Sequence, residues 1–211
     1  MFIYWYGASC FEISSKVSGE EISLFCNPFD KDYVGFNLRK VSADIVASAK
    51  KGKEYGATAG IKNNEGKSPF VVDMPGEYEK SGIFVCEFGF GDSLLFKIAL
   101  EGITLGFIPA IDIMLSEKQL EFFEDIDVLL LSLGGEKDLS LQDLADLVVK
   151  IDPKIVIPFD YKLPESKQEK KEVTAFCKKL GGLCENVDGK LKLTKTDIPE
   201  ENTKIIILAK S

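Results

Sequence analysis

Residues 43–56 read Ala-Asp-Ile-Val-Ala-Ser-Ala-Lys-Lys-Gly-Lys-Glu-Tyr-Gly, and this stretch carries a buried strand directly into a basic loop. Ile45 and Val46 are β-branched and favour the strand. A loop that leaves the edge of a sheet is a usual place for functional groups, because the rigid sheet positions them. We therefore expect the loop to border the functional site, with these candidate residues: Lys50, Lys51, Lys53 and Glu54.

The composition predicts one soluble globular domain spanning residues 1–211. Hydrophobic residues make up 45% of the chain and charged residues 28%, which is ordinary for such a domain. The apolar runs are far shorter than a membrane span. The formal net charge of −8 disfavours nucleic acid and anionic membranes as partners, because binding to phosphate needs a positive surface.

The cysteine and histidine content limits which catalytic and metal-binding groups the chain can supply. The five cysteines form an odd number without a close pairing pattern, which favours free, mostly buried thiols in a reducing cytoplasm. We see no signal peptide at residues 1–6 and predict a cytoplasmic location. The chain contains no histidine. An imidazole base, an imidazole metal ligand and a Ser-His-Asp triad are therefore excluded.

The first half of the chain predicts an antiparallel meander of short strands. Alternating apolar residues bounded by Gly, Pro and Asn are the signal for each strand. The expected strands are 2–6, 10–14, 21–27, 70–73, 83–88, 93–100 and 102–108.

The second half mixes helices with buried strands. Helices are expected at 116–124, where Ser116 and Gln119 form a capping box, at 140–150 and at 165–180. Strands are expected at 128–133, 155–158, 190–195 and 203–208. We assign Lys167, Lys170 and Lys171 to a solvated helix face. Two facing sheets with helices outside satisfy this pattern.

Several short motifs occur in a familiar order: Trp-Tyr-Gly-Ala-Ser-Cys-Phe at 5–11, Pro-Phe-Asp at 28–30, Pro-Gly-Glu-Tyr-Glu at 75–79, Asp-Val-Leu-Leu-Leu at 127–131 and Pro-Lys-Ile-Val-Ile-Pro at 153–158. In these motifs the chain resembles the metallo-β-lactamase superfamily, in particular the bacterial branch similar to ascorbate-phosphate lactonases. The resemblance runs nearly end to end. It implies an α/β fold, the four-layer αββα sandwich.

The resemblance places the family's metal motif, T-H-x-H-x-D-H, on residues 48–54. Ala49 and Lys51 then replace the first two histidines, Lys53 replaces the aspartate and Glu54 the third histidine. In the opening motif, Ala8 stands where the family has histidine.

The remaining ligand positions of the family also differ. Ala110 stands where the bridging aspartate is expected, and no matching histidine follows Glu77. The last metal histidine normally occupies an I-P-x-H-Y turn, and here Asp160 lies in Ile-Pro-Phe-Asp-Tyr. The resemblance thus implies a zinc hydrolase fold whose ligand positions hold other residues.

Without imidazoles these positions are unsuited to zinc, which favours nitrogen and sulfur ligands. Carboxylates alone suit Mg²⁺, Ca²⁺ or Mn²⁺. We predict no metal and no cofactor. In this interpretation the ammonium groups of Lys51 and Lys53 replace the metal's charge beside Glu54 and Asp160.

The first functional hypothesis is a non-catalytic binding or assembly protein. Its cleft would hold a small anion against Lys50, Lys51 and Lys53, or the protein would use its surface to bind a protein partner. A solvated loop explains these lysines equally well. Glu77 and Tyr78 are expected to fix the turn that walls the cleft, and both could face a ligand. A homo-oligomer is plausible because the lactonase-like branch often assembles.

The alternative is a repurposed hydrolase. Glu54 or Asp160 would act as a general base and Lys51 or Lys53 as an electrophile or nucleophile. Cys10 is a possible thiol nucleophile, although a packed, inert thiol is expected at a strand start. A third reading is a Mg²⁺ or Mn²⁺ hydrolase that uses the carboxylates of Asp30, Glu54, Asp73 and Asp160.

Overall fold

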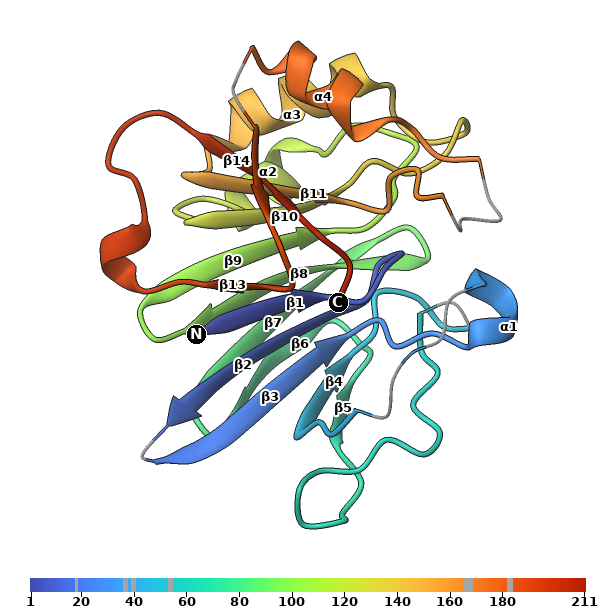
Figure 1. Cartoon of the computed structure of the whole chain (residues 1–211), viewed down its shortest axis with the longest axis vertical. Helices are drawn as coiled ribbons and strands as arrows, with labels where there is room; N and C mark the ends of the chain where they lie inside the picture. Colours follow the sequence, from blue (N-terminus) through green and yellow to red (C-terminus); the bar gives the residue numbers. More distant parts are fainter. Residues whose placement is uncertain (18, 36–37, 39–40, 53–54, 165–168, 182–183) are drawn as a thin grey trace.

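The computed structural model describes residues 1–211 except 18, 36–37, 39–40, 53–54, 165–168 and 182–183. Two β-sheets face each other, and helices lie on the outside (Figure 1). This is the predicted αββα sandwich of the α/β class.

The smaller sheet has the strand order β13-β1-β2-β3-β4-β5. Strands β1 to β3 are antiparallel, as predicted. The pairs β3–β4 and β4–β5 are parallel, so the prediction of an uninterrupted antiparallel meander is wrong here. The connections to β4 and β5 are long enough to return the chain to the same end of the sheet, as parallel pairing requires. The bounds are β1 Phe2–Trp5, β2 Phe11–Val17, β3 Glu20–Cys26, β4 Ile45–Ala47, β5 Phe70–Val72 and β13 Lys190–Lys192.

The larger sheet has the order β12-β14-β11-β10-β9-β8-β7-β6. Strands β7 to β9 form the predicted antiparallel meander, and β9, β10, β11 and β14 follow in parallel. Strand β6, which pairs with β7, was not predicted, because its Pro-Gly start indicated only a turn. Strand β12 was not predicted, because its sequence Cys-Glu-Asn-Val has no strand-like apolar run. The bounds are β6 Gly76–Lys80, β7 Ile83–Phe90, β8 Ser93–Leu100, β9 Ile103–Ile108, β10 Val128–Ser132, β11 Ile155–Phe159, β12 Cys184–Val187 and β14 Lys204–Leu208.

Helices α2, α3 and α4 gather over the larger sheet, and the single turn α1 lies near the smaller one (Figure 1). The predicted capping box at Ser116 is confirmed, with the Gln119 side chain bonded back to Ser116. A second capping box, which was not predicted, joins Asp143 to Ser140. No helix of the described residues is long and apolar enough to cross a membrane. The bounds are α1 Lys31–Val34, α2 Glu117–Phe122, α3 Leu141–Ile151, α4 Val173–Lys179 and a 3₁₀ turn, η1, at Lys195–Asp197.

The long helix predicted at 165–180 is wrong, because α4 begins only at Val173. The segment before it is held to neighbouring loops instead. The backbone N–H of Lys162 donates to the carbonyl of Lys171 at 2.9 Å, and the Lys171 ammonium donates to the Leu133 carbonyl at 2.9 Å. These tertiary bonds replace the local bonds of a helix.

Aromatic side chains from both sheets meet in the core. The Phe11 ring on β2 lies edge-on to Phe159 on β11, at 5.1 Å between centroids, and to Phe107 on β9 at 6.3 Å. Phe107 and Phe159 stack at 5.0 Å. All three are fully buried, and burying such a side chain contributes about 2 kcal/mol. This packing fixes the strands whose ends form the site.

Cys177 and Cys184 form a disulfide between α4 and β12. The prediction of only free thiols is therefore wrong for this pair. The seven-residue spacing gave no motif, because the pairing depends on how α4 packs beside β12. Cys10, Cys26 and Cys86 are free, as expected.

Replacing both Cys177 and Cys184 with Ser is expected to lower the free energy of unfolding by about 2 kcal/mol, because the bridge restricts the unfolded chain. Urea unfolding with and without dithiothreitol measures the effect. The wild type should lose stability in the reductant and the double variant should not. A Cys86→Ser variant is the control, because its thiol is free. Equal wild-type midpoints in both conditions would contradict a structural disulfide.

Candidate functional site

The site lies where several strand ends converge. Strands β9, β10 and β11 are parallel, and the register pairs Leu131 with Ile108 and Ser132 with Phe159. The loops that follow these strands therefore emerge at the same edge (Figure 1). The loop after β4 reaches the start of β8, where the Leu94 N–H donates to the Ala49 carbonyl at 2.7 Å. Such an edge is a usual ligand position in α/β sheets.

A cavity of about 610 Å³ opens between these loops. It carries both charge signs, with two lysines and three aspartates among its lining residues. It is lined by Lys50, Phe90, Gly91, Asp92, Ser93, Ala110, Ile111, Asp112, Ile113, Met114, Ser116, Gln119, Lys137 and Asp138. The loops after β4 and β9, which should carry ligands according to the resemblance, thus share one cavity.

Ala49 is a packed residue rather than a functional one. Its side chain is fully buried, and its N–H donates to Oδ1 of Asn27 at 2.6 Å. Asn27 adopts a positive φ of 49° and its side-chain amide also donates to the Ser9 carbonyl at 3.3 Å. Asn tolerates this backbone region better than most residues. The end of β3 therefore holds the loop after β4 in place.

Asp160 is the buried charged residue at the end of β11. Its Oδ2 accepts hydrogen bonds from the Lys170 ammonium at 2.9 Å and from the Ser132 hydroxyl at 3.3 Å. The side chains of Asp160 and Lys170 are only 10% and 14% exposed, so this is a largely desolvated ion pair. Burial raises the pKa of Asp160, and the Lys170 charge acts in the opposite direction.

Lys171, the next residue, attaches the same segment to the end of β10. Its ammonium donates to the carbonyls of Leu133 and Gly135, and burial lowers its pKa. The Gly135 N–H donates to Asp138 Oδ2 at 2.6 Å. A Cβ on Gly134 would lie 2.4 Å from that oxygen, so the turn requires glycine. Lys170 and Lys171 thus anchor a loop, and their assignment to a solvated helix face is wrong; Lys167 lies outside the described residues.

Of the β4-loop lysines that the structure describes, neither Lys50 nor Lys51 forms an ion pair with Asp160. Lys51 is exposed, and Lys50 is half-buried with its ammonium 3.8 Å from Asp92 Oδ1. The counter-charge of Asp160 is Lys170, and the prediction that Lys51 supplies it is wrong. Lys53 and Glu54, also predicted as site residues, lie outside the residues that the structure describes.

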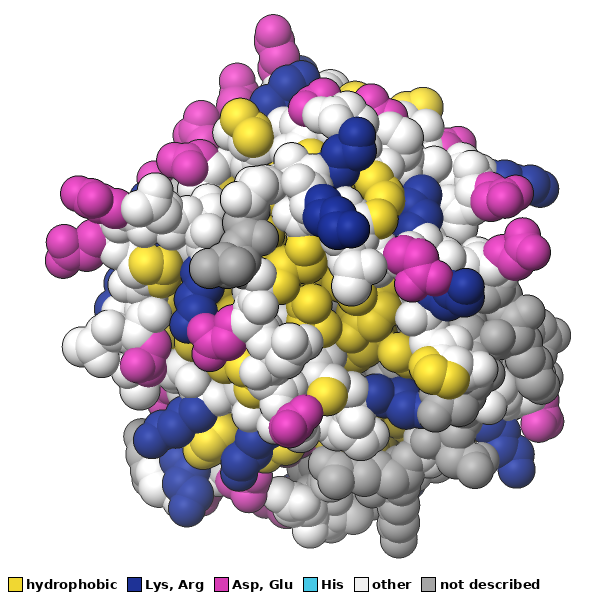
Figure 2. Space-filling model, turned by 45° about the horizontal axis from the view of Figure 1, so that its top comes forward, with side chains coloured by type: hydrophobic (Ala, Val, Ile, Leu, Met, Phe, Trp, Pro, Cys, Tyr) yellow, Lys and Arg dark blue, Asp and Glu magenta, His cyan; other side chains and the backbone are white. Residues whose placement is uncertain are grey.

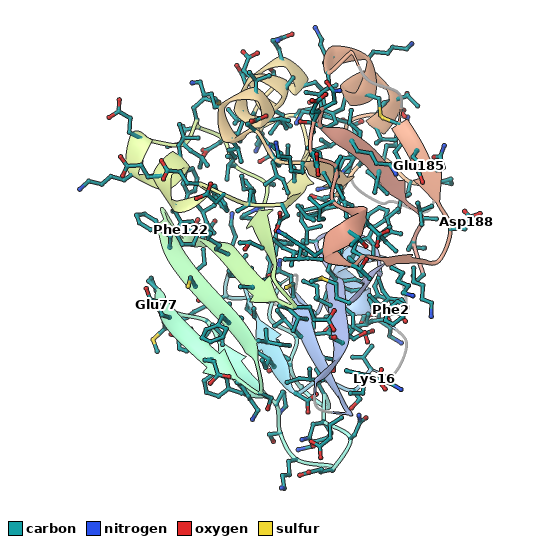
Figure 3. All side chains as sticks on the ribbon, turned by 90° about the vertical axis from the view of Figure 1, so that its left-hand side faces the viewer. Phe2, Lys16, Glu77, Phe122, Glu185 and Asp188 are labelled. Carbon is teal, nitrogen blue, oxygen red and sulfur yellow. A yellow bond between two sulfur atoms is a disulfide. The ribbon has the colours of Figure 1, made fainter. Side chains whose placement is uncertain are left out.

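Glu77 and Tyr78 lie on the edge strand β6. The Tyr78 hydroxyl donates to the Met74 carbonyl at 2.9 Å, which closes the turn around Pro75 and Gly76. Glu77 is exposed at the outer edge of the sheet (Figure 3). Neither residue lines the cavity of 610 Å³ or the adjoining one described below. Their predicted contact with a ligand remains a prediction.

The other candidate side chains are dispersed. Cys10 is fully buried, and burial raises its pKa well above that of an ordinary thiol, so it is a poor nucleophile. Asp30 caps α1 by accepting the Asp32 N–H at 3.0 Å. Asp73 lies at the end of β5 in a second cavity. Within the described part of the chain, no three His, Cys, Asp or Glu side chains come together to hold a metal ion.

The second cavity, of about 390 Å³, adjoins the first and shares Lys50, Gly91, Asp92 and Ser93 with it. Its other lining residues are Ser48, Ala49, Lys51, Asp73, Pro75, Gly89 and Leu94. We define it as the β4–β5 cavity, because the residues after these two strands form one wall.

Glu87 on β7 is a buried acid that sequence reasoning missed. It is 5% exposed, and neither carboxyl oxygen has a hydrogen-bond partner of normal geometry among the described residues. Burial and, to a smaller extent, the charge of nearby Asp73 raise its pKa to about 8, while the Met74 backbone acts in the opposite direction. Alternation along β7 was a usable signal, because Glu87 shares the inward face of Ile83 and Val85.

A zinc site does not fit the described residues. Zinc in proteins takes nitrogen, sulfur or carboxylate ligands in a tetrahedral arrangement. The ligand positions implied by the resemblance present the side chains of Ala49, Lys51 and Ala110, which supply no such ligand. Asp160, the remaining candidate among the described residues, already holds an ammonium at 2.9 Å.

Two facing sheets, outer helices and a cavity at converging strand ends define the αββα class of hydrolase-like proteins. A sequence profile described as the beta-lactamase superfamily domain matches residues 2–160. The chain belongs to this family, the metallo-β-lactamase superfamily.

Solved structures show the same fold. A candidate Zn-dependent hydrolase of the metallo-β-lactamase superfamily from Thermotoga maritima is 24% identical, with a TM-score of 0.79 over 99% of this chain and 100% of the other. A metallo hydrolase from Ignicoccus hospitalis is 18% identical, with a TM-score of 0.58 over 85% and 90%. The metallo-β-lactamase fold protein YhfI from Bacillus subtilis is 9% identical, with a TM-score of 0.64 over 100% of this chain and 96% of the other. A search among curated proteins found no match.

Proposed function

We propose that this protein is a non-catalytic binding protein built on the metallo-β-lactamase fold, with its zinc site lost. The observation that carries the proposal is the Asp160–Lys170 ion pair, whose carboxylate stands at the position of the family's last metal histidine. Ala49 and Ala110 occupy two further ligand positions with methyl groups. What remains is a cavity of about 610 Å³, which is large enough for a small ligand.

Electrostatics supports this proposal. A fixed ammonium 2.9 Å from the only carboxylate at the described ligand positions satisfies that carboxylate and repels a divalent cation. Binding a metal there would first require breaking a largely buried ion pair, which costs about 3 kcal/mol or more. The protein's own cation thus takes the place of the metal.

The proposed binding partner is a small molecule in the cavity or a protein at the surface. Nucleic acid stays outside the proposed partners because of the net charge of −8. Figure 2 shows lysines and carboxylates interspersed over one face of the molecule. Homo-oligomerisation stays a prediction. A cytoplasmic location also stays a prediction, and the Cys177–Cys184 disulfide is more typical of an oxidising compartment.

The alternative, a hydrolase that uses Glu54 and Asp160 with a non-zinc metal or with Lys51 and Lys53, has less support. Asp160 accepts hydrogen bonds from two side chains and is not available as a base. Lys51 is exposed, whereas a nucleophilic lysine needs a desolvated environment.

Metal retention tests the proposal. We expect the purified protein, after exposure to Zn²⁺, Mn²⁺ and Mg²⁺ and gel filtration, to retain well under one equivalent of any of them by inductively coupled plasma mass spectrometry. Asp160→Asn is the matched variant, because it removes the carboxylate charge and keeps the shape of the side chain. Wild type and variant should retain the same low amount of metal. Near-stoichiometric metal in the wild type that is lost in Asp160→Asn would overturn the proposal and support the hydrolase.

A further inference from the structure

Strand β6 is the last strand of the larger sheet, and its pairing partner is β7. A two-residue turn, Ser81–Gly82, joins these strands, and its φ angles of 52° and 83° are those of a type I′ turn. Such a turn makes its flanking residues, Lys80 and Ile83, a hydrogen-bonded pair. Bonded and non-bonded pairs alternate along antiparallel strands. The backbone N–H and C=O groups of Glu77 and Glu79 therefore point away from β7.

These outward groups are open to a partner strand. Among the described residues, no backbone hydrogen bond from a turn or loop reaches the N–H or C=O of Glu77 or Glu79. Glu77 lies at the outer margin of the sheet (Figure 3). We define the β6 edge as Gly76–Lys80 with its outward backbone groups. An unpaired edge of this kind is a template for one more strand.

The two faces of the β6 edge differ in chemistry. Glu77 and Glu79 are exposed on the outer face, where Glu79 stands opposite Phe84, which is 54% exposed. The side chain of Tyr78 points to the other face, and its ring lies edge-on to Phe70 of β5 at 6.0 Å between centroids. Phe70 is itself 40% exposed. One face is therefore acidic and the other is aromatic.

A second copy of this chain is a poor occupant of the β6 edge. When two copies of β6 pair antiparallel, residues that stand opposite each other point to the same face. Every such register that pairs most of β6 places Glu77 opposite Glu79, or one of these glutamates opposite its own copy. Like charges directly opposite each other destabilise a pair of strands. The edge therefore favours an occupant of opposite charge.

A strand with basic residues on one face and apolar residues on the other matches this edge. Lys or Arg opposite Glu77 and Glu79 forms cross-strand pairs of opposite charge, and the aliphatic stems of these side chains cover Phe84. The intervening residues point to the face of Phe70, where the Lys80 ammonium already lies 5.8 Å from the ring centroid. That face therefore takes apolar residues rather than further cations.

We propose that the β6 edge binds an extended peptide segment of a partner protein by strand addition, and that basic and apolar residues alternate in this segment. Its backbone bonds to Glu77 and Glu79, and its apolar side chains cover Phe70, Tyr78 and Met74, which is 61% exposed. The net charge of −8 favours the approach of a basic segment. Residues 77–80 line neither the cavity of 610 Å³ nor the β4–β5 cavity, so the inference goes beyond the proposed function and does not depend on it.

The first test is an NMR titration of the ¹⁵N-labelled full chain with the peptide Ac-Lys-Val-Lys-Val-Lys-Val-amide. The peptide should shift the backbone amides of residues 77–80. At a peptide concentration about ten times the Kd, hydrogen exchange at Glu77 and Glu79 should slow by about tenfold, because exchange then requires release of the peptide. Exchange at Tyr78 and Lys80, which already bond to β7, should change little. No shifts in residues 77–80, or shifts without slower exchange at Glu77 and Glu79, would overturn the inference.

Two peptide controls separate strand addition from charge attraction. Ac-Lys-Lys-Lys-Val-Val-Val-amide has the same composition and charge without the alternation, and it should bind about fivefold more weakly or worse. Methylating the backbone nitrogens of the lysines or of the valines blocks the donors on one side of the extended peptide. One of these two peptides should lose binding and the other should keep it. Equal affinity of the scrambled peptide, or equal effects of the two methylations, would contradict strand addition.

Protein variants locate the contact. Glu77→Lys should weaken binding of the Lys-Val peptide by about fivefold and strengthen binding of Ac-Glu-Val-Glu-Val-Glu-Val-amide, because it reverses the charge of one cross-strand pair. Glu200→Lys is the matched control, since it makes the same change in net charge at an exposed residue in the loop before β14. Equal losses in the two variants would show that only net charge matters and would overturn the inference.

Sedimentation velocity distinguishes the remaining occupant. The wild-type chain should not dimerise through this edge. A wild-type dimer that the Lys-Val peptide dissociates would assign the β6 edge to a second copy of the chain and overturn the inference. Metal retention has no bearing on this result, so the proposed function and the peptide site can fail separately.

Discussion

Replacing Glu87 with Gln is expected to stabilise the protein by about 2 kcal/mol at pH 9 and to change its stability little at pH 4. Burial raises the pKa of Glu87 from 4.5 to about 8 in the folded protein. Between these values the unfolded chain is ionised while the folded protein keeps its proton, so wild-type stability falls as pH rises. The full shift of 8 − 4.5 = 3.5 units corresponds to about 5 kcal/mol, and partial screening reduces this.

Urea unfolding between pH 4 and pH 9 measures this difference. Glutamine has the shape of a protonated glutamate, so the two proteins should agree near pH 4 and diverge toward pH 9. Glu77→Gln is the matched control, because Glu77 lies on the neighbouring strand and is exposed. Parallel curves for wild type and Glu87→Gln would show that Glu87 is ionised in the folded protein at neutral pH.

Replacing Lys170 with Met is expected to lower the free energy of unfolding by about 3 kcal/mol at pH 7, because it leaves the buried Asp160 charge unpaired. The deficit should shrink toward acid pH. Without Lys170 the pKa of Asp160 rises further above its ordinary 3.8, and protonation then removes the unpaired charge. Thermal or urea unfolding at several pH values measures both effects.

Two further variants make this measurement specific. The double variant Asp160→Asn/Lys170→Met should recover most of the loss, because no buried charge remains. Lys162→Met is the control, since Lys162 pairs with Glu172 at the same 2.9 Å but both side chains are more than half exposed. Exposed pairs contribute about 0–1 kcal/mol. Equal losses for Lys162→Met and Lys170→Met would contradict the burial argument.

The sequence predicted the fold well where local signals agree with tertiary structure. Helix α3 has a capping box at Ser140 and apolar residues at helical spacing, and it forms as predicted. The prediction of a helix at 165–180 placed its start too early. Lys171 bonds to the loop after β10, and sequence periodicity cannot detect such a contact. The Cys177–Cys184 disulfide was not predicted for the same reason, since the pairing depends on how α4 packs beside β12.

The site was predicted in part. The resemblance placed Ala110 and Asp160 at strand ends that the structure brings to one edge. It did not predict Lys170 as the partner of Asp160, because the two residues lie ten positions apart in the connection between β11 and α4, with no recognisable motif. Glu87 was accessible from sequence, as an acid at an inward position of an alternating strand.

The salt link between Asp160 and Lys170 has a consequence for how this lineage can change. A histidine introduced at position 160 by one substitution would leave a buried ammonium without its anion, and a histidine at 49 would have to displace packed neighbours of a fully buried methyl group. Each of these single substitutions thus lowers stability before any ion is bound. Building a zinc site at these positions requires several coordinated substitutions.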